Sequence, residues 1–324
     1  MNKVKEFVGV DVSKDTLDFY AEEVGHVQVS NDMHGYKQAL KKYGKAAVYV
    51  MEATGSYHHI LCLYLYERGV NVCVVNPLSV KRYIQMKLCR NKTDKSDAKM
   101  IAMYGASEDP KLWEPAAAYV EMSINIQGVV SKYFRERTSL KNKLHSLESK
   151  GCKKGVVIQS LKRSIKRLTS EIKKLEAEME RLVKENEPEL LSNLQSIPGV
   201  GRKTAMLLIS GTDGFRRFEH PNQVISYFGL APMEYSSGSS VRKQSRICKT
   251  GNPQIRNHLF LCSFTASQHN AQCRALYTRI VAKGKSKKLA LVAVCNKLIK
   301  QSFAIAKSGL PYDAEYRSMA PQMS

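Results

Sequence analysis

The sequence lacks a hydrophobic run long enough to cross a membrane, and it has few acidic residues for its many basic ones. No apolar stretch approaches the ~20 residues that a spanning helix needs, and the opening segment MNKVKEFVGVDVSKD reaches an aspartate before the core of a signal peptide develops. The 324 residues hold 29 Asp and Glu against 51 Lys and Arg, a formal net charge of +22. Such an excess favours a polyanionic partner, so we expect a cytoplasmic, nucleoid-associated protein that binds nucleic acid and no membrane.

Paired cysteine motifs are also missing. The eight cysteines are scattered, with no C-x-x-C pair and no histidine cluster at metal-ligand spacing. This pattern predicts reduced thiols in the core of a cytoplasmic protein rather than zinc ligands or disulfides.

The first block of the sequence, residues 5–105, alternates strand-like and helix-like segments. Short β-branched runs predict strands, and an apolar segment between two of them predicts a helix. This alternation indicates an α/β sheet domain. The predicted strands are Phe7–Val12, Thr16–Glu22, Ala46–Met51 and Val70–Val75, and the predicted helix is Ile60–Arg68.

The second block is helical, with apolar residues that step alternately by four and three, as in the a/d seam of a coiled coil. Leucines upstream have the same spacing, and Gly151–Gly155 supplies a turn, so we expect an antiparallel helical hairpin. Its seam is filled either by its own two helices or by another subunit. Nine cations and one acid lie in residues 150–174, so only the tip and the first half of the second helix are suited to contact phosphates. The seam is Leu161, Ile165, Leu168, Ile172, Leu175, Met179 and Leu182, after Leu140, Leu144 and Leu147.

Four acidic residues in the first block follow predicted strands or begin a predicted helix. Asp11 ends the first strand and Glu52 follows the third, while Asp94 and Asp97 are spaced to share one face at a helix start. Each alone is typical of a turn or a helix cap. Together, in a very basic chain, they indicate a site for Mg²⁺, with Mn²⁺ as a substitute, because hard divalent ions prefer carboxylate oxygens. Two neighbouring acids are set aside, since Asp15 lies in the turn and Asp18 alternates outward.

The third block, 190–310, contains two segments suited to phosphates. SIPGVGRKTA has glycines, Gly199 and Gly201, that would let backbone N–H groups at a helix start approach a phosphate beside Arg202 and Lys203; the alternative is a tight turn with no ligand. YSSGSSVRKQSRICKTGN, residues 235–252, joins serines to cations with no acid among them. It fits either a solvated phosphate-binding loop or a nucleophilic serine beside cations that stabilise developing charge. Those cations are Arg242, Lys243, Arg246 and Lys249.

Five motifs in this order resemble the DEDD-type insertion-sequence transposases of the family numbered one hundred and ten. They are GVDVSKDTLDFY, EATGSYHH, NKTDKSDA, SIPGVGRKTA and the SSG…KTGNPQIRNHL segment, and the resemblance covers nearly the whole chain. It implies an RNase H-like (RuvC-like) DEDD domain over 1–118, a coiled-coil helical hairpin over 119–189, and a mostly α-helical transposase domain with a helix-hairpin-helix over 190–310, before a tail at 311–324.

The resemblance also implies the chemistry. Asp11, Glu52, Asp94 and Asp97 take the four acidic positions that bind Mg²⁺, and the serine directly before the glycine, Ser237, takes the position of the nucleophile that forms a phosphoserine link to DNA. Ser236 is the alternative, with Ser239 and Ser240 in the same loop. Arg256 and Lys249 are then expected to make phosphate or structural contacts.

The expected function is therefore a DNA recombinase that cleaves and exchanges the strands of an insertion element. Similar transposases are guided by a structured RNA that pairs with donor and target DNA, and they act as dimers or tetramers in which the acidic site of one subunit meets the serine of another. The absence of a DNA-reading module such as a zinc finger is compatible with this guidance. The alternatives are a Holliday-junction-resolvase-like nuclease with no serine step, and a nucleic-acid-binding scaffold without catalysis.

Overall fold

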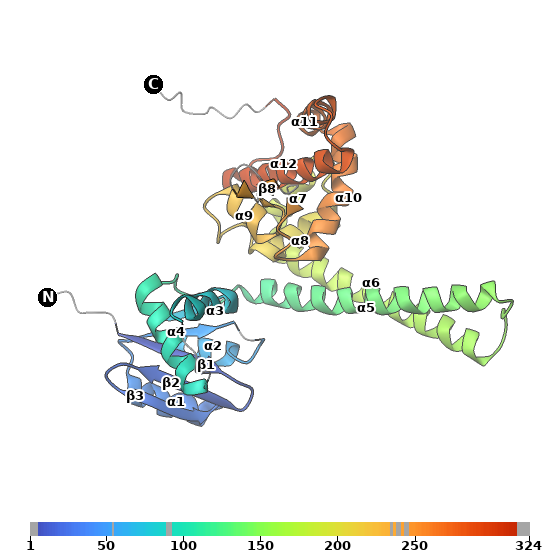
Figure 1. Ribbon diagram of the computed structural model, residues 1–324. Coiled ribbons are helices and arrows are strands. Elements are labelled where there is room, and N and C mark those ends of the chain that lie inside the picture. Colours follow the sequence, from blue (N-terminus) through green and yellow to red (C-terminus); the bar gives the residue numbers. More distant parts are fainter. Residues whose placement is uncertain are drawn as a thin grey trace, which may run out of the picture. The chain divides into compact units, whose positions relative to one another are not determined.

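The computed structural model describes residues 6–53, 55–88, 93–233 and 246–315, together with the backbone of residues 236–237 and 241–242. The chain forms two compact units, Met1–Pro115 and Ala116–Ser324. Each unit has its own hydrophobic core, so each is described by itself (Figure 1).

The first unit is built on a five-stranded mixed sheet in the order β3-β2-β1-β4-β5. Strands β1, β2 and β3 form an antiparallel meander, and β1, β4 and β5 are parallel. The two parallel neighbours therefore end at the same edge of the sheet as β1. The strands are β1 (Phe7–Val12), β2 (Thr16–Ala21), β3 (Gly25–Ser30), β4 (Val48–Glu52) and β5 (Val72–Val75).

Helices cover both faces of this sheet, as the α/β pattern of the sequence predicts. Alternate residues of the strands point to opposite faces. One face packs against α1 (Met33–Tyr43) and α2 (His59–Tyr66). The other packs against α3 (Pro77–Met86) and α4 (Asp94–Glu108) through a smaller core. The sequence analysis missed β3, α1 and α3, whose apolar residues are interspersed with polar ones.

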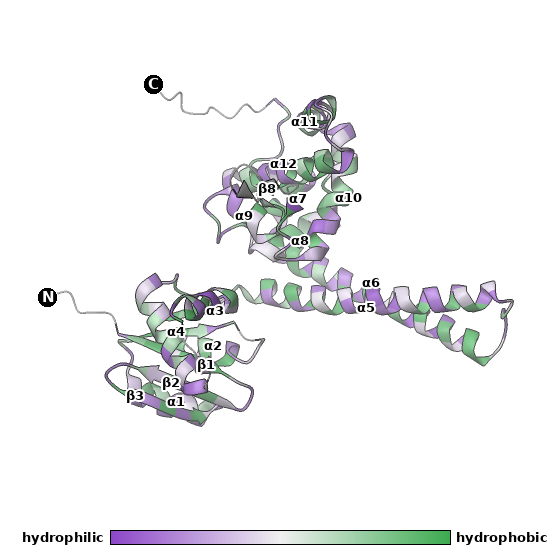
Figure 2. Cartoon of the chain, viewed as in Figure 1, coloured by the Kyte–Doolittle hydropathy of each residue, from purple (hydrophilic) through white to green (hydrophobic). Residues whose placement is uncertain are grey.

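The second unit begins with two long helices, α5 (Ala118–Ser149) and α6 (Val156–Asn186), which form an antiparallel hairpin (Figure 1). Contacts across the pair include Lys162 Nζ to Glu148 Oε1 at 3.2 Å near the turn. The predicted seam is buried at Leu168, Ile172 and Met179 but only half-buried towards the turn. Figure 2 shows polar residues along much of both helices outside the seam. Whether a further chain covers the seam stays a prediction.

The remaining helices form a bundle around the main core of this unit. Contrary to the expectation from the sequence, one described helix, α12 (Lys287–Ser308), is long and apolar enough to cross a membrane by length and composition, but half of its most apolar stretch is buried in this core. Its apolar character is therefore explained by packing in the bundle. The helices are α7 (Pro188–Gln195), α8 (Arg202–Thr212), α9 (Pro221–Tyr227), α10 (Pro253–His269), α11 (Ala271–Ala282) and α12 (Lys287–Ser308).

The cysteines of the described residues are all free thiols. Cys62, Cys73, Cys273 and Cys295 are buried, as expected. The expectation of core thiols is wrong for Cys152, which is exposed in the turn between α5 and α6, where two helices alone enclose no core. Cys89 lies outside the described residues.

Candidate functional site

A row of carboxylates crosses the centre of the sheet on the face that α4 covers. Asp11 in β1 is paired with Asp18 in β2, so their side chains lie on the same face. On the other side of β1, Val10 is paired in parallel with Met51, which places Glu52 beside Asp11. Three adjacent strands thus each contribute one acid, and the predicted strand-end positions of Asp11 and Glu52 are confirmed.

Helix α4 approaches this row closely because Gly9 of β1, which faces the helix, has no side chain. A Cβ on Gly9 would lie 2.0 Å from the carbonyl oxygen of Ala98 and 2.4 Å from the amide nitrogen of Ala102. Only glycine allows such contact of helix and strand backbones. Gly9 is two residues before Asp11, so the close approach fixes the first turn of α4 over the acidic row.

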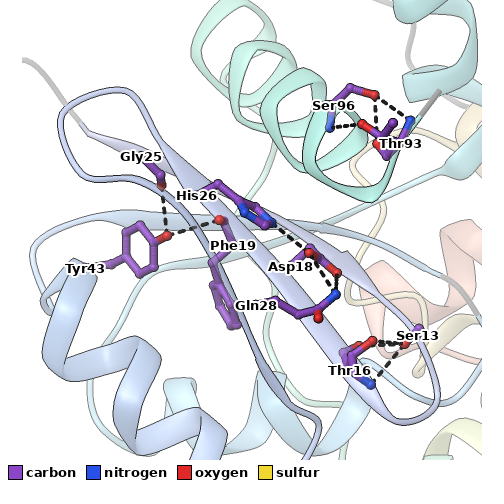
Figure 3. A network of polar contacts seen from close by, with 10 residues as sticks. All are labelled: Ser13, Thr16, Asp18, Phe19, Gly25, His26, Gln28, Tyr43, Thr93 and Ser96. Carbon is purple, nitrogen blue, oxygen red and sulfur yellow. Dashed lines mark hydrogen bonds and ion pairs between the residues drawn. The ribbon is translucent and has the colours of Figure 1, made fainter. Parts of the chain in front are cut away.

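That first turn carries the two remaining predicted acids. Thr93 caps the helix: its hydroxyl accepts from Ser96 N at 3.2 Å, and Ser96 Oγ accepts from Thr93 N at 2.9 Å (Figure 3). Asp94 and Asp97 follow in the first turn, where the helix dipole favours negative charge. Of the NKTDKSDA motif, Asn91 and Lys92 lie outside the described residues.

The charges of these acids act on one another. The pKa of Asp11 is raised to about 6, most of all by burial and then by the neighbouring carboxylates of Asp97, Asp94 and Asp18, in that order of effect. Repulsion among carboxylates of this kind falls when a cation lies among them. Asp94 and Asp97 therefore lie close enough to Asp11 to act on its charge, and the role of these acids as metal ligands stays a prediction.

Asp18 was expected to point outward, and that expectation is wrong. It is 4% exposed, because α4 covers the face of the sheet that the sequence suggested was open to solvent. Its carboxylate accepts from Gln28 Nε2 at 3.1 and 3.2 Å and lies 2.7 Å from His26 Nε2, both in β3 (Figure 3). Sequence reasoning missed this site residue because it missed β3, whose His26 and Gln28 stabilise the buried charge.

The donor set suits a hard divalent ion, since it consists of carboxylates from neighbouring strands and from the first turn of α4. Within the described ranges, however, no three His, Cys, Asp or Glu side chains are close enough to hold one metal ion. The backbone positions of the four acids therefore fit a metal site, and their side chains would have to turn towards a shared centre to form it.

The described parts of the serine segment belong to two short antiparallel ladders. Strand β6 (Pro232–Met233) pairs with β9 (Arg246–Ile247), and β7 (Ser236–Ser237) pairs with β8 (Val241–Arg242). Ser237 stands opposite Val241, and Ser236 opposite Arg242. Lys243, Ser239 and Ser240 lie outside the described residues.

Close backbone packing at two glycines supports the base of this segment. A Cβ on Gly229 would lie 2.2 Å from the carbonyl oxygen of Thr250, and one on Gly251 would lie 2.2 Å from that of Tyr227. Arg256 Nη1 donates to the carbonyl oxygens of Phe228 at 3.0 Å and Gly251 at 2.9 Å. Of the two expected roles, the Arg256 side chain thus has the structural one, whereas Arg246 and Lys249 are exposed cations.

The SIPGVGRKTA segment is a tight turn between α7 and α8. Gly199 has a φ of +104°, and a Cβ there would lie 2.7 Å from Cβ of Ala266 in α10. Gly199 is thus needed for packing against α10. At Gly201, which precedes α8, an added Cβ would meet open space, so its backbone is the more accessible of the two to a phosphate.

The two cations that follow are already paired within the unit. Arg202 Nη1 donates to Glu180 Oε1 at 2.8 Å, and Lys203 Nζ donates to Glu176 Oε1. Both acids belong to the acid-rich second half of α6. A phosphate at the start of α8 would therefore compete with these carboxylates for the two cations.

Comparison with known proteins gives this arrangement a family. Residues 8–147 match the family model of DEDD transposases of the IS110 type, and residues 191–278 match the model described as the transposase IS116/IS110/IS902 family. The two ranges together span more than half of the chain and hold the four acids and Ser237. The chain belongs to the IS110 family of transposases. It is thus a DNA transposase or recombinase enzyme.

Individual relatives extend the likeness over nearly the whole IS110-family chain. It is 28% identical to the pilin gene-inverting protein of Moraxella bovis, over 95% of this chain and 98% of that one. It is 23% identical to the transposase for insertion sequence element IS1111A of Coxiella burnetii, over 90% of this chain and 87% of that one. A shorter match, 32% identical over 37% of this chain and 30% of the other, is to the insertion element IS110 uncharacterized 43.6 kDa protein of Streptomyces coelicolor.

Membership of this transposase family bears on the fold and the cofactor. The DEDD domain implies an RNase H-like fold, and the mixed sheet of the first unit is consistent with it. It also implies dependence on a divalent metal and action on DNA.

Proposed function

We propose that this transposase cleaves and exchanges the DNA strands of an insertion element through two groups of residues, an acidic metal site and a serine nucleophile. The metal is Mg²⁺, with Mn²⁺ as a substitute, and its ligands are Asp11, Glu52, Asp94 and Asp97. The nucleophile is Ser237. The observation that carries the proposal is the electrostatic coupling of Asp11 to Asp97 and Asp94, acids that lie more than eighty residues away in the sequence.

The acids would act by position and charge. A bound divalent ion supplies charge that polarises the phosphate and offsets the charge that develops during displacement. Asp11 and Glu52, on adjacent strands, would hold the ligand oxygens at fixed spacing. Asp94 and Asp97 would close the site from the first turn of α4.

The serine would perform the covalent step. Its oxygen would bond to phosphorus as the bond from phosphorus to a deoxyribose oxygen breaks, with the hydroxyl proton passing to a base and the leaving oxygen taking up a proton. The resulting phosphoserine ester would conserve the bond for rejoining to another strand. Arg242, Lys243, Arg246 and Lys249 would stabilise the charge on the phosphate oxygens.

Site choice in the proposal comes from a structured RNA that pairs with donor and target DNA, because the described residues contain no module that reads base pairs in a groove. The enzyme would act in the cytoplasm at the nucleoid as a dimer or tetramer, with the acidic site of one subunit meeting Ser237 of another. The helix-hairpin-helix role of α7, α8, Gly199, Gly201, Arg202 and Lys203 and the coiled-coil role of α5 and α6 belong to the same proposal.

The deciding experiment is to trap a covalent protein–DNA adduct and to identify the modified residue by mass spectrometry. We expect the adduct on Ser237, its loss in Ser237→Ala, and its retention in the matched variant Ser236→Ala. A Ser237→Ala variant that still cuts DNA in the presence of Mg²⁺ would contradict the serine step and favour a resolvase-like nuclease. Loss of Mg²⁺ binding in Asp11→Asn, measured by calorimetry, tests the acidic site separately.

Subunit sharing has its own test. An equimolar mixture of Asp11→Asn and Ser237→Ala proteins should recover strand exchange if each active centre combines the acids of one subunit with the serine of another. Recombination of a defined target by the purified protein without RNA, at undiminished site choice, would remove the guide RNA from the proposal.

A further inference from the structure

A groove in the second unit lies among α5, α8 and the start of α10. It has a volume of about 770 Å³, within the range of about 300–1,000 Å³ that is usual for pockets that bind small ligands. Its lining includes Arg135, Lys203, Asn257 and His258, and none of the described residues that line it is acidic. A lining of this kind suits an anionic ligand with several hydrogen-bond acceptors.

Gln127 in α5 supplies the observation that points to a ligand. Its side chain is only 6% exposed, and its Nε2 atom is buried with no hydrogen-bond partner. It lines both this groove and a smaller adjoining cavity of about 350 Å³. A buried amide without a partner is unfavourable, and this cost is offset when a ligand supplies the missing acceptor.

Gly128, the next residue of α5, keeps the groove open. It lies in the interior of a helix, where glycine is less favourable than alanine. An added Cβ there would meet no atom within 4 Å, so packing does not require the glycine. Any larger side chain at this position would extend into the groove.

The cations of the groove lie on its rim. Arg135 is exposed, and its Nε donates only a long bond, 3.4 Å, to the carbonyl oxygen of Ser131. Lys203 is bonded to Glu176, which lines the smaller cavity but not the groove. Arg135 is therefore the cation better placed for a phosphate, with Lys203 shared between its acid and the ligand.

We propose that this groove binds one unpaired nucleotide of a nucleic-acid strand, with its phosphate against Arg135 and Lys203 and the edge of its base against the Gln127 amide. A glutamine amide can donate to N1 and accept from the N6 amino group on the Watson–Crick edge of adenine. That edge is free only when the base is unpaired, because Watson–Crick pairing occupies it. The proposal concerns binding and does not depend on the metal site or on Ser237.

The test measures binding of the full-length chain to short labelled single strands by fluorescence anisotropy, in EDTA so that no strand is cut. The probes are oligoadenylate, oligouridylate and oligodeoxyadenylate. We expect a preference for adenine over uracil that falls about tenfold in Gln127→Leu, which keeps the side-chain volume but removes the amide. The ratio of the affinities for oligoadenylate and oligodeoxyadenylate shows which nucleic acid the groove binds. A requirement for ribose indicates RNA, and equal affinities indicate a site that accepts DNA.

Two pairs of variants provide matched controls. Gly128→Leu fills the groove and should weaken binding of every probe at least tenfold, whereas Gly128→Ala should not; both should melt at or above the temperature of the parent, because both replace a helical glycine. Arg135→Ala should reduce affinity and lower the slope of log affinity against log salt by about one. Lys132→Ala removes the same charge from α5 outside the groove and should leave the adenine preference unchanged. Parent binding without a base preference, or full affinity in Gly128→Leu, would overturn the proposal.

Discussion

Gly9 of β1 lies directly against Ala98 of α4, with room for no side chain between them: a Cβ on Gly9 would fall 2.0 Å from the Ala98 carbonyl oxygen. This contact joins two parts of the acidic cluster that are far apart in the sequence. Asp11 lies two residues after Gly9, and Asp97 lies directly before Ala98. The separation between the two carboxylates is thus set by a backbone contact.

The first prediction is that Gly9→Ala disables the proposed metal site without removing any of its four proposed ligands. Overpacking against backbone should destabilise the first unit by about 3 kcal/mol, the upper end of the usual range, and shift α4 away from β1. Urea unfolding and Mg²⁺ calorimetry measure the two effects. Gly128→Ala, where the new Cβ meets nothing, is the control and should be stabilising. Normal Mg²⁺ affinity in Gly9→Ala would show that the contact does not set the site.

The second prediction concerns pH. The pKa of Asp11 in the folded protein, about 6, lies above its ordinary value of 3.8, so the folded state favours the protonated form. Without metal, stability should therefore fall as the pH rises from about 4 to 6 and then level off. Thermal melts across this range, compared with Asp11→Asn, isolate the contribution. Parallel profiles of melting temperature against pH for the parent and Asp11→Asn would contradict this contribution of Asp11.

The same pKa predicts proton release on metal binding. Because a ligand carboxylate must be ionised, Mg²⁺ affinity should rise between pH 5 and 7, and calorimetry in buffers of different ionisation enthalpy should detect the released proton. In Asp97→Asn the nearest repelling charge is gone, so the Asp11 transition of the metal-free protein should move to lower pH. An unchanged midpoint would mean that burial alone raises the pKa of Asp11.

A third prediction follows from the pairing of α8 with α6. Replacing both partner acids, as Glu176→Gln with Glu180→Gln, should free Lys203 and Arg202 and also Lys184, which pairs with Glu180. Nucleic-acid binding at low salt should strengthen, and its salt dependence should steepen by up to about three. The control, Glu178→Gln with Glu185→Gln, removes the same charge from α6 but releases only Arg181. Equal gains in the two double variants would indicate a general effect of net charge.

The fourth prediction separates the two ends of the hairpin. Leu168 is 5% exposed, so Leu168→Ala should cost about 2–5 kcal/mol. Leu161 is half-buried near the turn, so Leu161→Ala should lower the free energy of unfolding by clearly less. Urea unfolding of dilute protein provides the comparison. A larger loss at Leu161 that depends on protein concentration would instead indicate that another subunit covers the outer seam.

The sequence predicted those elements that a local pattern of residues determines. Strand β1 was predicted with its observed bounds, and Asp11 was placed at its end, because a short apolar run bounded by a turn is a local signal. Asp18 was misjudged because its burial depends on α4, some eighty residues away, and on hydrogen bonds from β3. The role of Gly199 was also open, since a PGVG turn does not reveal that Ala266 fills the space beside it.

The serine segment shows the opposite limit. Its composition suggested a flexible loop, yet four two-residue strands form two ladders there, and strands so short have no periodicity to detect. The proposal that Ser237 is the nucleophile rests on resemblance to a family. The groove beside Gln127 had no sequence signal, because its walls come from three helices that are brought together only by the fold.

Helix α6 is unbroken from Val156 to Asn186, and this continuity has a mechanical consequence. At ~1.5 Å per residue it is a stiff rod about 45 Å long, with its cationic turn at one end and the acids that hold Arg202 and Lys203 near the other. A helix of this length resists bending. A tilt or twist that a bound strand imposes at the turn would therefore also displace the part of α6 that contacts the start of α8. The hairpin thus couples the turn mechanically to the ion pairs of Arg202 and Lys203, so that movement at one place changes the forces at the other.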